Sequence, residues 1–329
     1  MSKLNQLSEI RKKLNNFLPN LDEEELESIL VKLAELKSYF IAEDNQEKLK
    51  EIWCLEKIIA IKKIYLLAFY KLKSKEYYEA WCSLEQIEIY LSQLFRHLNT
   101  DDELFPRVAF IKQHILQYQS LFPYKLFGSP EFTIKDKICS VCHKKNSIRH
   151  PCGHKNGEIY DGEICYQIWE GIEFVLLALV EFPVQKFCVA FSSDPETEKK
   201  IDHYDYRILE YLMNCLQSPF DYWEVHKTTI RHPHSNYLHL KPDDYCPCNS
   251  GKKYSHCCLS EAGVFQPHCE FGFFVSPPED IEVVKYLKPI PKKEVKELVP
   301  LTVNTAITKL SGYVVQTAKG DFVKINVYI

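Results

Sequence analysis

The stretch Tyr245–Leu259 reads YCPCNSGKKYSHCCL and contains four of the 13 cysteines of the chain. Its Ser-Gly-Lys-Lys run begins like a phosphate-binding loop, which needs a glycine, four further residues and then Gly-Lys-Ser or Gly-Lys-Thr. Cys246 stands where the first glycine is required, and Lys253 stands where the hydroxyl residue is required. The stretch therefore does not predict a nucleotide site.

The spacing of the thiols predicts a metal site instead. One residue separates the first two cysteines, and two adjacent cysteines follow eight residues later. Four thiolates at this spacing can surround one tetrahedral Zn²⁺ at about 2.3 Å, and a complete set of four soft ligands favours a structural ion. Asn249 and Gly251 in the intervening turn tolerate positive φ. His256 is the substitute ligand should one of the four thiols not bind, but four cysteines already complete a tetrahedron. The predicted ligands are Cys246, Cys248, Cys257 and Cys258.

This stretch resembles the SEC-C motif, the zinc-binding module named for the C-terminus of the preprotein translocase motor SecA. The pattern Cys-x-Cys-x-Ser-Gly-Lys-Lys-Tyr-x-x-Cys-Cys is matched from Cys246 to Cys258, with Asn249 in place of the usual glycine and Ser255 in place of a frequent basic residue. The ATP-binding motifs of the motor are absent. The resemblance implies a zinc module that binds a chaperone, the ribosome or another partner, and it implies an exposed surface at Lys252, Lys253 and Tyr254.

A second cluster of cysteines and histidines occurs between residues 139 and 165. Cys139-x-x-Cys142 is the spacing of half a zinc site, and the partner half is open. We expect Cys139, Cys142, Cys152 and Cys165 to be the ligands, with His154 as the alternate ligand; four free buried cysteines are the simpler interpretation. Cys165 precedes a segment expected to be helical, and a helix N-terminus would stabilise its thiolate.

The first 128 residues predict an all-helical domain. The first glycine of the chain is Gly128, and the preceding sequence is rich in Leu, Ile, Lys and Glu. Apolar spacing predicts helices after Pro19, over Glu47–Lys73 and Glu76–Leu98, and from Pro106 onward. The sequence around Tyr77 and Ala80 resembles the centre of a tetratricopeptide unit, although no 34-residue period is sustained and a plain helical bundle is equally compatible.

The remainder predicts a multidomain α+β protein. We expect a zinc-ribbon-like element over 129–170, an α+β region over 171–245, the SEC-C module over 246–260, and a linker with a C-terminal β-hairpin over 261–329. Within these regions, 168–182 is expected as a buried helix, 184–192 as a buried strand, 204–218 as a helix and 220–230 as a strand. The linker is expected over 276–300, and the hairpin is expected to turn at Lys319-Gly320.

Charge and hydropathy bear on three questions: nucleic-acid binding, membrane insertion and cellular location. The net charge of −4 gives the whole chain no attraction to nucleic acid, but residues 134–156 hold six Lys or Arg against the single acid Asp136. The longest apolar run, Phe174–Val180, is far too short to cross a bilayer, and the N-terminus lacks the apolar region of a signal peptide. We therefore expect no membrane insertion and a reducing cytoplasmic location, where clustered cysteines bind metal more often than they form disulfides.

These observations favour a non-catalytic adaptor with two structural Zn²⁺ sites that binds a protein or a ribonucleoprotein. One alternative is a nucleic-acid-binding accessory factor that uses the basic segment Lys135–Lys155. Another is a metal-dependent hydrolase built on the histidines between His226 and His239, although polar loop histidines flanking a zinc module are the favoured explanation of these residues. The sequence contains no G-x-S-x-G, H-E-x-x-H or dinucleotide-binding glycine pattern. The four histidines are His226, His232, His234 and His239.

Overall fold

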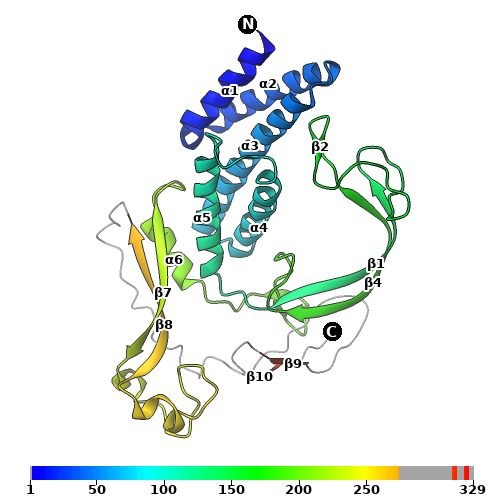
Figure 1. Cartoon of the computed structure of the whole chain (residues 1–329). Helices are drawn as coiled ribbons and strands as arrows, with labels where there is room; N and C mark the ends of the chain where they lie inside the picture. Colours follow the sequence, from blue (N-terminus) through cyan, green and yellow to red (C-terminus); the bar gives the residue numbers. More distant parts are fainter. Residues whose placement is uncertain (1, 274–312, 317–321, 326–329) are drawn as a thin grey trace. The chain divides into compact units, whose positions relative to one another are not determined.

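A computed structural model describes residues 2–273, 313–316 and 322–325 (Figure 1). The chain divides into two compact units, Met1–Cys188 and Val189–Ile329. Helices make up the N-terminal part, and paired antiparallel strands with short helices follow. The protein is therefore α+β, as the sequence predicts. None of the helices in the described residues is long and apolar enough to cross a membrane.

Five helices form the N-terminal bundle, in agreement with the helical prediction. Helix α2 begins with a capping box in which Asp22 Oδ1 accepts from the Glu25 N–H at 2.8 Å and Glu25 Oε2 accepts from the Asp22 N–H at 3.3 Å. The core is lined by leucine, isoleucine and aromatic side chains from every helix. The helices are α1 (Lys3–Phe17), α2 (Glu23–Ala42), α3 (Gln46–Lys73), α4 (Tyr77–Leu94) and α5 (Phe105–Leu121), with a 3-10 turn η1 at Leu18–Asn20.

Helices α3 and α4 are joined by a short basic turn, as expected for the segment that resembles a tetratricopeptide unit. Ala80 is fully buried, which allows the two helices to approach closely. The pair extends from Gln46 to Leu94 and is therefore longer than a 34-residue unit. The arrangement is that of helices packed in a bundle, which is the other architecture compatible with the sequence.

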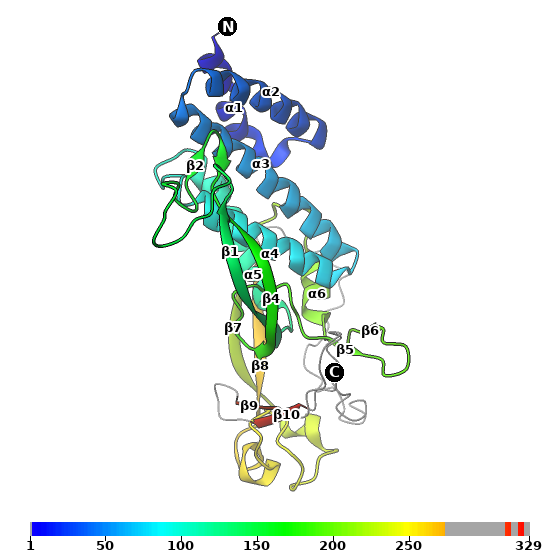
Figure 2. The same ribbon diagram turned by 90° about the vertical axis from the view of Figure 1, so that its right-hand side faces the viewer.

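A long two-stranded ribbon leaves the bundle (Figure 2). It pairs β1 (Phe127–Cys139) with β4 (Gln167–Val180) in antiparallel register. The prediction of a buried helix over 168–182 is wrong, because this segment is mostly strand and its side chains from Trp169 to Leu176 are exposed. Gly171 adopts a positive φ of 62°, a backbone conformation that glycine tolerates and that is foreign to a regular helix.

The buried strand expected over 184–192 is also wrong, because this range contains only a single bridge residue at Val189 and the first residue of β5 (Ser192–Ser193), which pairs with β6 (Lys200–Ile201). Side chains of α4 bind the backbone here. Trp81 Nε1 donates to the carbonyl of Lys186 at 2.6 Å, and Tyr78 Oη donates to the carbonyl of Phe187 at 2.8 Å. Backbone groups held by a helix in this way are not available for a strand ladder.

The segment between β1 and β4 carries the cysteine cluster that begins at Cys139, and it packs against the helical bundle. A small hairpin, β2 (Ile159–Tyr160) with β3 (Glu163–Ile164), lies next to α3. Lys37 of α2 forms an ion pair with Glu163 at 2.5 Å, and His97 Nε2 lies 2.8 Å from the carbonyl of Gly157. The cysteine cluster is thereby held at both ends, by the ribbon and by this contact.

The second unit is organised around a second ribbon, β7 (Trp223–His232) paired with β8 (Val264–Phe273) over their full lengths. The predictions of a helix and a strand here are confirmed by α6 (Arg207–Cys215) and β7, whereas β8 was not predicted. Strands β9 (Tyr313–Gln316) and β10 (Phe322–Ile325) pair as the expected hairpin. Its predicted turn at Lys319-Gly320 and the linker expected over 276–300 lie outside the described residues. Three 3-10 turns frame the SEC-C stretch: η2 (His234–Tyr237), η3 (Tyr254–His256) and η4 (Cys258–Ser260).

Candidate metal sites

The four cysteines of the opening stretch converge between β7 and β8. Their sulfur atoms all lie within 4.8 Å of one another. Cys248 Sγ is 3.5 Å from Cys257 Sγ, and the latter is 3.9 Å from Cys258 Sγ. Cys246 and Cys258 are buried at 2% and 3% exposure. This is a closed four-thiol cage, the donor set of a structural zinc ion.

The turn between the two cysteine pairs has the conformation expected from its sequence. Asn249 and Gly251 adopt φ values of 61° and 73°. The Cys246 N–H donates to the carbonyl of Lys252 at 2.7 Å, which closes the loop and returns the chain toward the second pair. Burial raises the pKa of Cys248, but hydrogen bonds from Ser250, Cys246 and Cys257 together outweigh it, and the pKa falls to about 7. A thiol poised in this way ionises readily when a metal arrives.

Tyr254 is buried beside the four-thiol cage, whereas the resemblance implies an exposed tyrosine. Its side chain is only 3% exposed, and its hydroxyl lies 2.6 Å from Nδ1 of His234. Nε2 of the same histidine lies 2.8 Å from the carbonyl of Glu261, so Nε2 carries the proton and Nδ1 accepts from the tyrosine. Lys252 and Lys253 are exposed. The small core around the cage contains Tyr237, Cys246, Tyr254, Cys258 and Val264.

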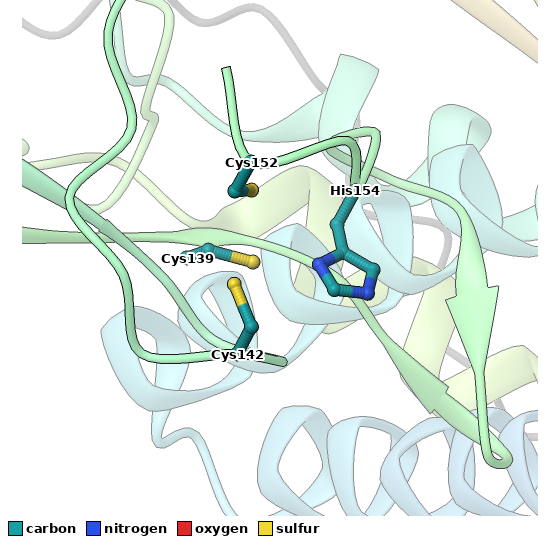
Figure 3. Close-up of side chains that lie close together, drawn as sticks. All are labelled: Cys139, Cys142, Cys152 and His154. Atoms are coloured by element: carbon teal, nitrogen blue, oxygen red, sulfur yellow. The ribbon is translucent and has the colours of Figure 1, made fainter. Parts of the chain in front are cut away.

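The second candidate site lies at the tip of the first ribbon. Cys139 ends β1, and Cys142 follows one turn later. Figure 3 shows Cys139, Cys142, Cys152 and His154 directed toward a common centre, and their ligand atoms lie within 4.8 Å of one another. Three thiols and one imidazole form a common donor set of structural zinc sites.

His154 and Cys165, the two competing candidates for the fourth ligand, differ in their surroundings. One imidazole nitrogen of His154 faces the sulfur atoms in Figure 3, and its Nδ1 is buried without a hydrogen-bond partner among the described residues. A buried polar atom without a partner is costly, and a metal ion would satisfy it. Cys165 lies outside the four-atom group, although its Sγ is 3.9 Å from Cys139 Sγ.

The pKa values of Cys139 and Cys165 are shifted in opposite directions. Burial raises the pKa of Cys139, but hydrogen bonds from the backbone of Cys142 and Val141 and from the side chains of Cys152 and Cys142 together outweigh it and lower the pKa to about 6. Burial and the neighbouring Cys139 raise the pKa of Cys165 to about 11. Cys165 is therefore suited to donate its S–H to the Cys139 thiolate, a contact that supports a metal ligand from outside the coordination sphere.

The four histidines proposed for a hydrolytic site do not gather. Only the two clusters above bring together three or more metal-binding side chains within the described residues, and neither contains His226, His232, His234 or His239. His226 is an exposed strand residue 3.5 Å from Glu224, and His234 begins the 3-10 turn η2 rather than continuing β7. The two imidazoles of the His-x-His stretch therefore do not share one strand face.

Comparison with known proteins identifies one segment. Residues 244–260 match the SEC-C motif family, and this range contains all four cysteines of the cage and the turn between them. No curated protein matches the chain, and no solved structure matches it. The chain thus carries a SEC-C motif, a zinc-associated module, between β7 and β8.

Proposed function

We propose that the protein is a zinc-binding adaptor without catalytic activity, holding two structural Zn²⁺ ions and binding a macromolecular partner. The observation that carries the proposal is the pair of four-ligand clusters, each with its ligand atoms within 4.8 Å. The ligands are Cys246, Cys248, Cys257 and Cys258 in one site and Cys139, Cys142, Cys152 and His154 in the other. Cys165 stands beside the second set as an accessory thiol.

The donor sets support structural rather than catalytic ions. A catalytic zinc site keeps one position for water or substrate, whereas both clusters supply four protein ligands. Each site also shapes the chain around it: the SEC-C cage includes two of the buried residues of its local core, and the other site closes the tip of the β1–β4 ribbon. Metal binding in such small units supplies folding free energy.

Two exposed lysines support an interaction role for the SEC-C turn. Lys252 and Lys253 project from the loop that joins the cysteine pairs. Lys253 approaches Asp243 at 3.2 Å, but both side chains remain largely in solvent. We place the protein in the reducing cytoplasm, with a protein or ribonucleoprotein complex as the partner.

Elemental analysis of the purified full chain tests the metal assignment. The expected result is about two zinc ions per chain, and about one in the Cys246→Ser/Cys248→Ser variant. A content near zero in a folded protein would refute the proposal.

Co-purification tests the adaptor role. The proteins recovered with the wild type are compared with those recovered with the Lys252→Glu/Lys253→Glu variant and with Cys269→Ser, which is the matched control. Equal recovery of every partner by all three would contradict a role for the SEC-C surface.

A further inference from the structure

The β1–β4 ribbon has two chemically different faces. In the paired register, Phe132 lies opposite Phe174, and Ile134 lies opposite Ile172. Successive residues of a strand point to opposite faces, so Lys135 and Lys137 lie on the other face. Lys137 is directly opposite Trp169 there, and Lys135 covers Gly171, at which an added Cβ would meet the Lys135 Cβ at 2.7 Å.

The loop after Cys142 extends this second face by one more lysine. Ile138 forms an antiparallel bridge with Lys145, the Cys139 N–H donates to the carbonyl of Lys144 at 3.0 Å, and the Asn146 N–H donates to the carbonyl of Lys137 at 2.7 Å. This pairing sets Lys145 on the apolar face, where it forms an ion pair with Asp136 at 2.8 Å. The alternation therefore sets Lys144 on the same side as Lys137. We call Lys135, Lys137, Lys144 and Trp169 the basic face.

Acidic side chains of this region are mostly directed elsewhere. Asp136 and Glu170 lie opposite each other on the apolar face. Asp161 accepts from Gln46 at 2.7 Å, and Glu163 pairs with Lys37, so both are engaged with the helical bundle. Two acidic residues remain on the basic face in this register: Glu173, opposite Thr133, and Glu131, opposite Leu176. Three lysines thus lie together on this side of the ribbon, toward its metal end, with one acidic residue of each strand farther from the tip.

Trp169 gives this face a second kind of binding group. It is 49% exposed, whereas the other three tryptophans, Trp53, Trp81 and Trp223, are 3%, 4% and 0% exposed. An exposed indole beside lysines is the combination with which proteins hold single-stranded nucleic acid, because bases stack on the ring while phosphates meet the cations. A duplex keeps its bases stacked internally, and an acidic peptide has no planar base to stack on the ring.

We propose that the basic face binds single-stranded nucleic acid, with Lys135, Lys137 and Lys144 contacting phosphates and Trp169 stacking against a base. This inference rests on the proposed function, because the metal ligands Cys139 and Cys142 hold Lys144 beside β1. The inference makes a single-stranded nucleic acid the partner of the region around the Cys139 site.

The test titrates the full-length protein with a fluorescein-labelled 20-nucleotide single strand, as RNA and as DNA, following anisotropy and tryptophan emission. Binding should weaken with salt, and emission should be quenched because Trp169 is the exposed tryptophan. In Lys135→Gln/Lys137→Gln/Lys144→Gln, the slope of log K against log salt should become shallower by about 2. Trp169→Ala should lower affinity roughly tenfold, and Trp169→Phe should restore most of it.

Lys145→Gln is the matched control, since it removes one charge from the same loop on the opposite face. It should leave the tryptophan quenching intact. Binding that is absent, insensitive to salt, equal for duplex and single strand, or displaced equally well by polyglutamate would overturn the inference. Zinc is measured on the same samples: two ions without nucleic-acid binding would refute the basic face alone, whereas absent zinc would refute the proposed function.

Discussion

The sulfur atoms of Cys139 and Cys165 lie 3.9 Å apart, although only Cys139 belongs to the four-atom cluster at the ribbon tip. Both thiols are almost completely buried, at 1% and 3% exposure. Cys165 lies at hydrogen-bond distance from a thiol of the cluster without joining the cluster itself. Metal chemistry at this site should therefore distinguish two neighbouring cysteines.

We predict that the His154→Ala variant loses the zinc ion of the Cys139 site on dialysis against a mild chelator, whereas the Cys165→Ser variant retains it. Loss of a ligand removes a metal bond, but loss of an accessory hydrogen bond weakens binding by about 10- to 100-fold. Elemental analysis should give about one and about two zinc ions per chain, respectively. The absorption spectrum of the Co²⁺-substituted protein provides an independent count of thiolates. The reverse result would make Cys165 the fourth ligand.

Cys246→Ser/Cys248→Ser should destabilise the second unit by several kcal/mol, because metal binding in such a site contributes directly to folding. The measurement is thermal unfolding, followed by circular dichroism with and without chelator. Cys269→Ser, on β8 outside the cage, is the control and should melt like the wild type in both conditions. If the double variant and the control melt together, the cage does not stabilise this unit.

Tyr254→Phe should cost about 1 kcal/mol without releasing zinc, because it removes the 2.6 Å hydrogen bond with His234 but keeps the buried ring. The free energy of unfolding in urea, together with the zinc content, measures both effects. His234→Ala, combined with Tyr254→Phe in a double-mutant cycle, should add less than its separate cost, because the two residues share one bond. Strict additivity would show that the contact has no energetic role.

The buried His114 should make the helical bundle sensitive to acid. Burial lowers the pKa of His114 to about 4, below the value of about 6.5 in an unfolded chain. Between these values the unfolded state binds more protons, so stability is full above pH 6.5 and falls as the pH drops toward 4, by roughly 3 kcal/mol in total. His114→Gln should flatten this pH dependence relative to the wild type in urea unfolding. An unchanged slope would contradict the assignment.

Local sequence patterns were sufficient for helices α2 to α6 and for the grouping of the SEC-C cysteines, but they also predicted a helix over 168–182 where the structure has a strand. The ligands of the cage lie within 13 residues, so their spacing alone brings them together. The choice between His154 and Cys165 was not accessible in this way, because it depends on how the β2–β3 hairpin returns to the ribbon. An unpaired buried imidazole nitrogen becomes visible only in three dimensions.

The ribbon shows where hydropathy misled the prediction. The run from Ile168 to Val180 is apolar enough to suggest burial, and a continuous apolar run fits helix and strand alike. Three apolar residues of its first half, Ile168, Ile172 and Phe174, nevertheless share one strand face, with Glu170 between them and Glu173 on the other face. Gly171 and this period of two were the available indications of a strand. Burial of Tyr254 was missed because the contact with His234 lies 20 residues away in the chain.

The order of the ligands along the chain has a consequence for synthesis on the ribosome. Cys139, Cys142, Cys152 and His154 are all made before the first residue of β4, Gln167. If these residues hold zinc as proposed, the tip can bind the ion while β1 still lacks a partner strand. The loop closed by the ion is short, so its entropic cost is small. When β4 leaves the ribosome, the turn at the ribbon tip is then already folded. The two strands can pair from the Cys139 end of the ribbon outward.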